Sequence, residues 1–155
     1  MSAVVRTHTL FLDKECLLEA LDVIGTKYTV QGNMIVTDRV DYYGPEKFIW
    51  ENDRFLFVHD STANKEQRYP WNRNNLKEWV SVGSFLRSVD AEYRNAYGVK
   101  MERIAEEERR AEEERIRNMI EGKRSEIIAK AREKGYYIKE TKEGNQIQLV
   151  LTRTV

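Results

Sequence analysis

The stretch KYTVQGNMIVTDRVDYYGPEKFIWENDRFLFV, residues 27–58, decides the fold, because apolar and β-branched residues fill it and two turn signals interrupt it. The first signal is Gln31-Gly32-Asn33 and the second is Glu51-Asn52-Asp53. Gly, Asn and Asp tolerate the positive φ angles that tight hairpin turns require. The spacing predicts a meander of antiparallel strands over residues 27–43, 47–50 and 54–58.

The two ends of the chain carry further β patterns. A run of β-branched and apolar residues predicts a strand over residues 4–12, and turn residues between two short runs predict a hairpin over 136–152. In the last strand Ile147, Leu149 and Leu151 share one face, as in a strand with one buried side. Because an isolated hairpin is marginal, we expect both ends to join the meander in one antiparallel sheet. On this hypothesis Leu149→Asp unfolds the whole protein.

Helical periodicity occupies the rest of the chain. A short helix is predicted from Asp13, a residue that caps helix N-termini, to Ile24, and Gly25 suits its C-terminal end. The lone cysteine, Cys16, lies within this helix and is interpreted as a buried structural thiol. A second, partly buried helical region is expected from residue 76, with a break or kink at Gly98.

A highly charged helix is predicted over residues 101–134, in which ten acidic and ten basic residues stand among 34. Pairs four residues apart in acid-before-base order, such as Glu106–Arg110 and Glu113–Arg117, add only about 0.2–0.5 kcal/mol each. We therefore expect apolar residues to anchor the helix at its ends, namely Met101, Ile104, Ile116, Met119, Ile120, Ile127 and Ile128. A sustained apolar heptad is missing, so an extended coiled coil is the lesser interpretation.

Taken together, the patterns predict an α+β fold with an antiparallel sheet, one short helix and one long charged helix. At 155 residues we expect a single domain over 1–155, with 101–134 as a charged helical elaboration. The 26 Lys and Arg residues balance the 26 Asp and Glu residues, so no global charge attracts nucleic acid or anionic membrane. With no long apolar run and one cysteine, a cytoplasmic protein without cofactor, metal or membrane partner is expected.

Both ends of the chain resemble one known family. The N-terminal part of the pattern runs from Thr7 to Gly25, and the C-terminal part runs from Ala131 through Gly135-Tyr136 to Arg153. Together they resemble the family named after hypothetical chloroplast reading frame thirty-five, a domain of unknown function in plastids, cyanobacteria and other bacteria. The opening Met1-Ser2-Ala3-Val4 and the charged stretch over 102–117 depart from that family's pattern.

The resemblance implies an α+β fold and supplies no catalytic residue. Bacterial members of that family often lie near genes for AAA-type ATPases, so the resemblance alone implies an AAA-type ATPase as the protein partner. If the protein belongs to a plastid, the expected location is the plastid stroma instead of the cytoplasm.

An enzyme is not expected, because the sequence shows no recognisable set of catalytic or metal-binding residues. A nucleophile with its base, a carboxylate pair in a pocket or a set of metal ligands would be needed. His8 and His59, the two histidines, fall on separate predicted strands that could be neighbours in a sheet. We interpret them as polar residues at strand surfaces rather than as metal ligands.

A nucleic-acid hypothesis rests on residues 65–79, where basic residues stand on both sides of Tyr69 and Trp71. Basic groups would contact phosphates while the aromatic rings stack on bases, and single-stranded RNA is the favoured ligand. The alternative is a solvated loop whose aromatic rings dock on the core. The candidate nucleic-acid-binding residues are Lys65, Arg68, Tyr69, Trp71, Arg73 and Lys77.

A protein-interaction hypothesis rests on the charged helix. A mixed-sign helix offers many hydrogen-bonding groups and little apolar area, which suits a transient partner. The candidate partner-binding residues are Glu106, Arg110, Glu113 and Arg117. A non-enzymatic adaptor with an unidentified protein partner is therefore the favoured interpretation, and single-stranded nucleic-acid binding is the alternative.

Overall fold

The computed structural model describes residues 3–61 and 80–153 of the chain. Its contacts divide the chain into two compact units, unit 1 (Met1–Glu102) and unit 2 (Arg103–Val155). The α+β class is confirmed, whereas the expectation of a single domain stays a prediction. The elements are β1 (Val4–His8), α1 (Lys14–Val23), β2 (Tyr28–Gln31), β3 (Met34–Asp41), β4 (Gly44–Glu51), β5 (Arg54–Asp60), α2 (Val82–Glu133), β6 (Tyr137–Glu143) and β7 (Gln146–Thr152).

Unit 1 contains a five-stranded antiparallel sheet with the order β1-β5-β4-β3-β2. Both predicted tight turns are confirmed: Gly32 adopts a φ of 59°, and Asn52 and Asp53 adopt 52° and 61°. A further tight turn pairs Asp41 with Gly44, so β4 begins three residues earlier than expected. The meander is therefore formed by consecutive hairpins, and β1 joins it beside β5.

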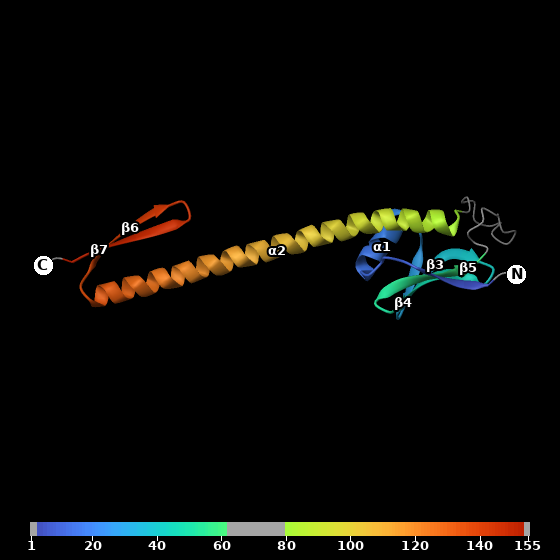
Figure 1. Ribbon diagram of the computed structural model, residues 1–155, viewed down its shortest axis with the longest axis horizontal. Coiled ribbons are helices and arrows are strands. Elements are labelled where there is room, and N and C mark those ends of the chain that lie inside the picture. The colour runs from blue at the N-terminus through green and yellow to red at the C-terminus, as the bar shows by residue number, and fades with distance from the viewer. Residues whose placement is uncertain (1–2, 62–79, 154–155) are drawn as a thin grey trace. The chain divides into compact units, whose positions relative to one another are not determined.

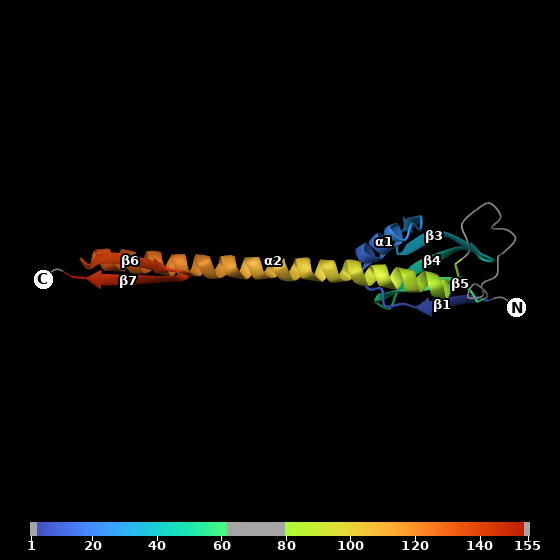
Figure 2. The same ribbon diagram turned by 90° about the horizontal axis from the view of Figure 1, so that it is seen from above.

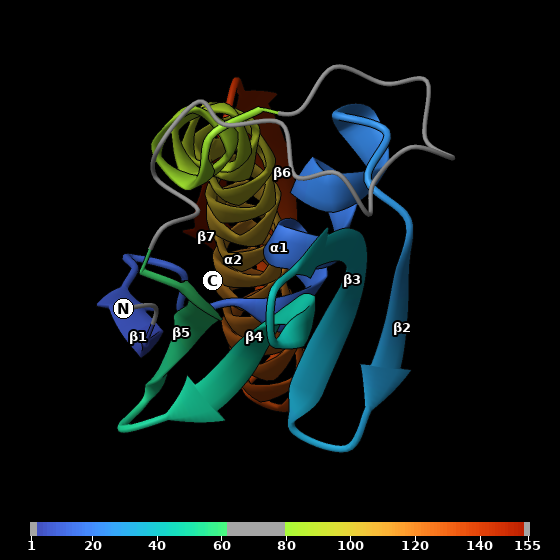
Figure 3. The same ribbon diagram turned by 90° about the vertical axis from the view of Figure 1, so that its right-hand side faces the viewer.

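Two helical segments cover one face of this sheet, as Figure 3 shows. Helix α1 is capped as predicted, since the backbone N–H of Cys16 donates to Asp13 Oδ1 at 3.0 Å. Cys16 is buried at 2% exposure, and Gly25 ends the helix with a φ of 76°. The core side chains come from α1, from the first turns of α2, from the covered sheet face and from the segment between β1 and α1; they include Phe11, Leu17, Leu21, Ile35, Phe48, Phe57, Val82, Phe85, Val89 and Tyr93.

Helix α2 is one continuous helix from Val82 to Glu133 (Figure 1), so the predicted break at Gly98 is wrong. Ser81 caps its start, because the Ser81 hydroxyl accepts from the Ser84 backbone N–H at 3.2 Å. A glycine inside a helix costs about 1 kcal/mol. The burial of Tyr93 and Ala96 just before Gly98 offsets that cost, and the helix continues.

Unit 2 consists of the rest of α2 and the hairpin β6–β7, which follows the last turns of the helix (Figure 2). Gly135 ends the helix with a φ of 77°, and the Tyr136 backbone N–H donates to the Ala131 carbonyl at 2.9 Å. The hairpin is confirmed, but its predicted place in the main sheet is wrong, because β6 and β7 form a separate two-stranded sheet. Its covered face lies on α2 instead, where Arg124 forms a bidentate ion pair with Glu140.

Candidate functional site

The four predicted partner-binding residues lie on one face of α2 within unit 2. Their spacing of four, three and four residues places them along successive turns of the same side. Glu106 accepts hydrogen bonds from Arg109 and Arg110, and these bonds lower the pKa of Glu106. The expected Glu106–Arg110 ion pair is thus confirmed at 2.9 Å, whereas Glu113 pairs with Arg109 rather than with Arg117.

A groove of about 820 Å³ opens between this face of α2 and the tip of the hairpin. Glu113 and Arg117 contribute to its rim, while Glu106 and Arg110 continue the same helix face toward the N-terminus. We call it the hairpin groove, and its lining residues are Glu113, Ile116, Arg117, Ile120, Glu121, Lys142, Gly144, Asn145 and Ile147.

The apolar side chains that were expected to anchor the charged helix are largely exposed. Among the described residues 103–153, Ala131 is the one buried apolar side chain. The exposed fractions are 43% for Ile116, 54% for Met119, 37% for Ile120 and 45% for Ile127. The expectation that packing anchors the helix is therefore wrong for these four residues and also for Met101, which is 39% exposed.

The hairpin side of the groove was not identified from the sequence. Lys142, Asn145 and Ile147 belong to the hairpin and reach α2 only because the chain reverses at Gly135. The alternation of the last strand indicated that Ile147 faces a covering surface, but no local signal names the helix as that surface. The predicted nucleic-acid segment, with Lys65, Arg68, Tyr69, Trp71, Arg73 and Lys77, lies outside the described residues.

The two histidines do not form a shared site. They lie on the neighbouring strands β1 and β5, where His8 pairs with Leu56 and His59 pairs with Val5. Positions three apart on a strand point to opposite faces of the sheet. The two strands are thus neighbours, but the two imidazoles are not. His8 is exposed, whereas His59 is buried and hydrogen-bonded to Thr7 at 2.7 Å, so the interpretation as a strand-surface residue is wrong for His59.

Within residues 3–61 and 80–153, no group of three His, Cys, Asp or Glu side chains is placed to hold a metal ion. None of the described helices combines the length and the apolar character needed to cross a membrane. Comparisons with protein-family models, with curated proteins and with solved structures find no match to this chain. The resemblance to the chloroplast reading-frame family, the cytoplasmic location and the absence of catalysis stay predictions.

Proposed function

We propose that this protein is a non-enzymatic protein-interaction module whose partner binds along α2 at the hairpin groove. The observation that carries the proposal is the groove itself, in which exposed apolar side chains lie between charged residues that the sequence had singled out. A folded unit that leaves Ile116 and Ile120 more than a third exposed gains free energy when a second protein covers them.

The lining residues of the groove favour a protein partner that offers both apolar and charged side chains. Ile116, Ile120 and Ile147 provide apolar surface, and the rim carries Glu113, Glu121, Arg117 and Lys142, two charges of each sign. A mixed rim repels a uniform polyanion at its acidic positions and matches a segment with apolar side chains flanked by both charges. The partner segment is therefore expected to be amphipathic.

Site-specific photocrosslinking in an extract of the source organism tests this function. A photoreactive amino acid in place of Arg117 should capture a defined protein, and the same amino acid in place of Arg103 serves as the control, because Arg103 is exposed and is not a lining residue. Ile116→Asp should reduce the capture at least about tenfold, since it would place a charge against the apolar part of the partner.

The extract is divided and one half is treated with nuclease. Capture that survives nuclease and depends on Ile116 supports the adaptor. Two results would contradict the proposal: recovery of nucleic acid in place of protein, and equal capture from positions 103 and 117. Recovery of nucleic acid would favour the segment 65–79 as the binding element.

A further inference from the structure

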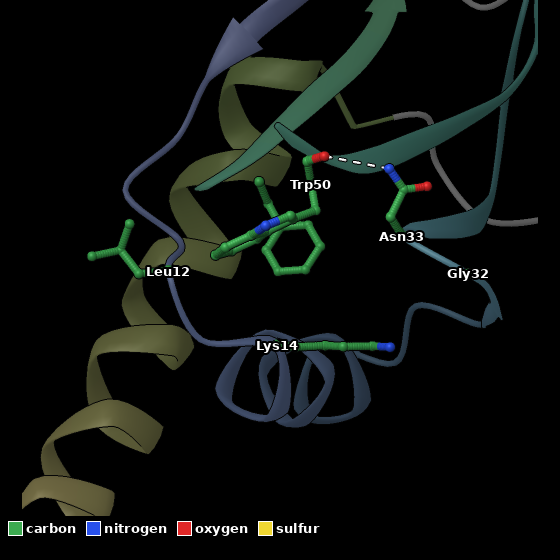
Figure 4. A pocket seen from close by; sticks show the side chains of 6 residues that line it. Leu12, Lys14, Gly32, Asn33 and Trp50 are labelled. Atoms are coloured by element: carbon green, nitrogen blue, oxygen red, sulfur yellow. Dashed lines mark hydrogen bonds between the residues drawn. The ribbon is translucent and has the colours of Figure 1, made fainter. Parts of the chain in front are cut away.

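Unit 1 contains a second hollow, which shares no lining residue with the hairpin groove of unit 2. It has a volume of about 290 Å³, and three separate segments meet there (Figure 4). These are the start of α1, the β2–β3 turn and the end of the β4–β5 hairpin. We call it the Trp50 pocket, and its lining residues are Leu12, Lys14, Gly32, Asn33, Trp50 and Phe55.

The walls of the Trp50 pocket are held in place by the fold itself. Trp50 and Phe55 are directly paired across β4 and β5, with their ring centroids 4.9 Å apart in an edge-to-face arrangement. The Trp50 backbone N–H donates to the Asn33 carbonyl at 2.9 Å, and the Phe55 backbone N–H donates to the Phe11 carbonyl at 2.9 Å. A ligand would therefore meet a preorganised surface.

The surface of the pocket is mainly apolar and open to solvent. Leu12 is 53% exposed and Trp50 is 37% exposed, although both stand next to the core residues Phe11 and Phe55. Tryptophan at the centre of a concave apolar surface is the residue type that most often dominates a protein interface. The pocket is at the lower end of ligand-pocket volumes, so it suits one large side chain better than a nucleotide cofactor.

Lys14 gives the pocket its electrostatic character. It is the only charged residue among the lining residues, and it forms no ion pair within the described part of the chain. The neighbouring carboxylates of Asp13 and Glu15 are both engaged by Lys100, at 2.7 and 2.9 Å. The Lys14 ammonium is thus available to an anionic group of a ligand.

We propose that the Trp50 pocket binds a peptide segment of a partner protein in which a large apolar side chain stands beside a carboxylate. The apolar side chain packs on Trp50, Phe55 and Leu12, and the carboxylate pairs with Lys14. The Asn33 side chain, whose amide nitrogen lies 3.4 Å from the Trp50 carbonyl, offers its oxygen to a backbone N–H of the peptide. This site is independent of the hairpin groove.

A peptide fits the charges better than a nucleic acid does. Nucleic-acid affinity grows with the number of phosphates that are neutralised, and the lining residues supply one cation. Acidic residues also stand close in the chain, since Glu51 and Asp53 follow Trp50 in the same hairpin and Glu15 follows Lys14. A single carboxylate on an apolar segment avoids the repulsion that a polyanion would meet.

Titration of the isotope-labelled protein followed by NMR tests the proposal with three probes. Acetyl-Phe-Glu-amide should shift the Trp50 indole N–H and the Asn33 side-chain amide signals, with a Kd of about 1 mM, which corresponds to about −4.1 kcal/mol. Acetyl-Phe-Gln-amide should bind about two- to fivefold more weakly, the effect of one exposed ion pair. Acetyl-Ala-Glu-amide should give no saturable shift.

Variants complete the test. Lys14→Gln should make the two phenylalanine probes bind equally, while Lys47→Gln, a lysine on the opposite face of the sheet, should leave their difference unchanged. Equal binding of both probes to the wild type, a lack of saturable shifts, or comparable shifts with adenosine 5′-monophosphate would each overturn the proposal. None of these outcomes bears on crosslinking at the hairpin groove, so the two proposals fail separately.

Discussion

Glu46 is fully buried on the covered face of the sheet, where its carboxylate forms an ion pair with Arg39. The Arg39 guanidinium also donates to the Val80 carbonyl at 2.9 Å and stacks on the Phe85 ring at 4.3 Å. Burial raises the pKa of Glu46, the Arg39 charge and hydrogen bond oppose this rise, and the charge of Asp41 adds to it. These contacts join β3 and β4 to the start of α2.

Arg39→Met should lower the free energy of unfolding of unit 1 by about 3–5 kcal/mol at pH 8, because it leaves a buried carboxylate without its counter-ion. The folded-state pKa of Glu46 lies above its unfolded value of 4.5, and the variant raises it further. As pH falls through that raised pKa toward 4.5, Glu46 becomes protonated and the cost of the substitution should shrink. Urea unfolding of both proteins across this pH range measures the difference.

A double variant separates charge from packing in this comparison. Arg39→Met with Glu46→Leu removes both charges, and it should recover most of the stability lost by the single variant and lose its pH dependence. A single-variant cost that stayed constant between pH 4.5 and pH 8 would show that the stacking on Phe85, not the ion pair, holds this contact.

At the scale of elements, α2 continues through Gly98 although no neighbouring side chain or backbone packs closely against that glycine. A Cβ added at Gly98 meets no other atom within 4 Å, and Gly98 is exposed and helical. Gly98→Ala should therefore raise the free energy of unfolding of unit 1 by about 0.5–1 kcal/mol. Thermal and urea unfolding measure this gain.

The matched control is Gly25, which also has open space around it but adopts a φ of 76°. Gly25→Ala should lower stability by about 1–2 kcal/mol, because a side chain is strained in the left-handed region. A loss of stability in Gly98→Ala would indicate that α2 must bend at this point, as the sequence pattern had suggested.

The elements that the sequence predicts well are those with local causes. The Asp13 cap, the Gly25 and Gly135 termini and the turn at Asn52-Asp53 each depend on a few adjacent residues, and the structure confirms them. Strand pairing depends on residues far apart in the chain, so the alternation of β7 revealed an apolar face but not which surface covers it. The Trp50 pocket escaped prediction for the same reason, since its three segments meet only in the folded sheet; a tryptophan directly before a tight turn was the one available signal.

At the scale of the whole molecule, the position of the hairpin changes what a substitution in β7 should do. The expectation of global unfolding depends on β7 sharing a sheet with β1, whereas β7 pairs with β6 alone among the described strands. Leu149 is partly buried on the covered face of the hairpin, while the core of unit 1 is formed by residues up to Ala96. A destabilising substitution at Leu149 should therefore affect the packing of the hairpin and not the core of unit 1.

Leu149→Asp should unfold the hairpin and leave the five-stranded sheet intact. Leu149 lies directly opposite Glu140, so the new carboxylate would face a like charge across the strands and would compete for Arg124, the partner of Glu140. Hydrogen exchange measured by mass spectrometry should show lost protection over 137–152 and unchanged protection over 34–60. Val150→Asp is the matched control: Val150 is 43% exposed on the other face, opposite Lys139, so an acidic residue there should preserve the hairpin. If Leu149→Asp also removed protection from β3, β4 and β5, the two units would unfold cooperatively and the chain would behave as the single domain expected from its length.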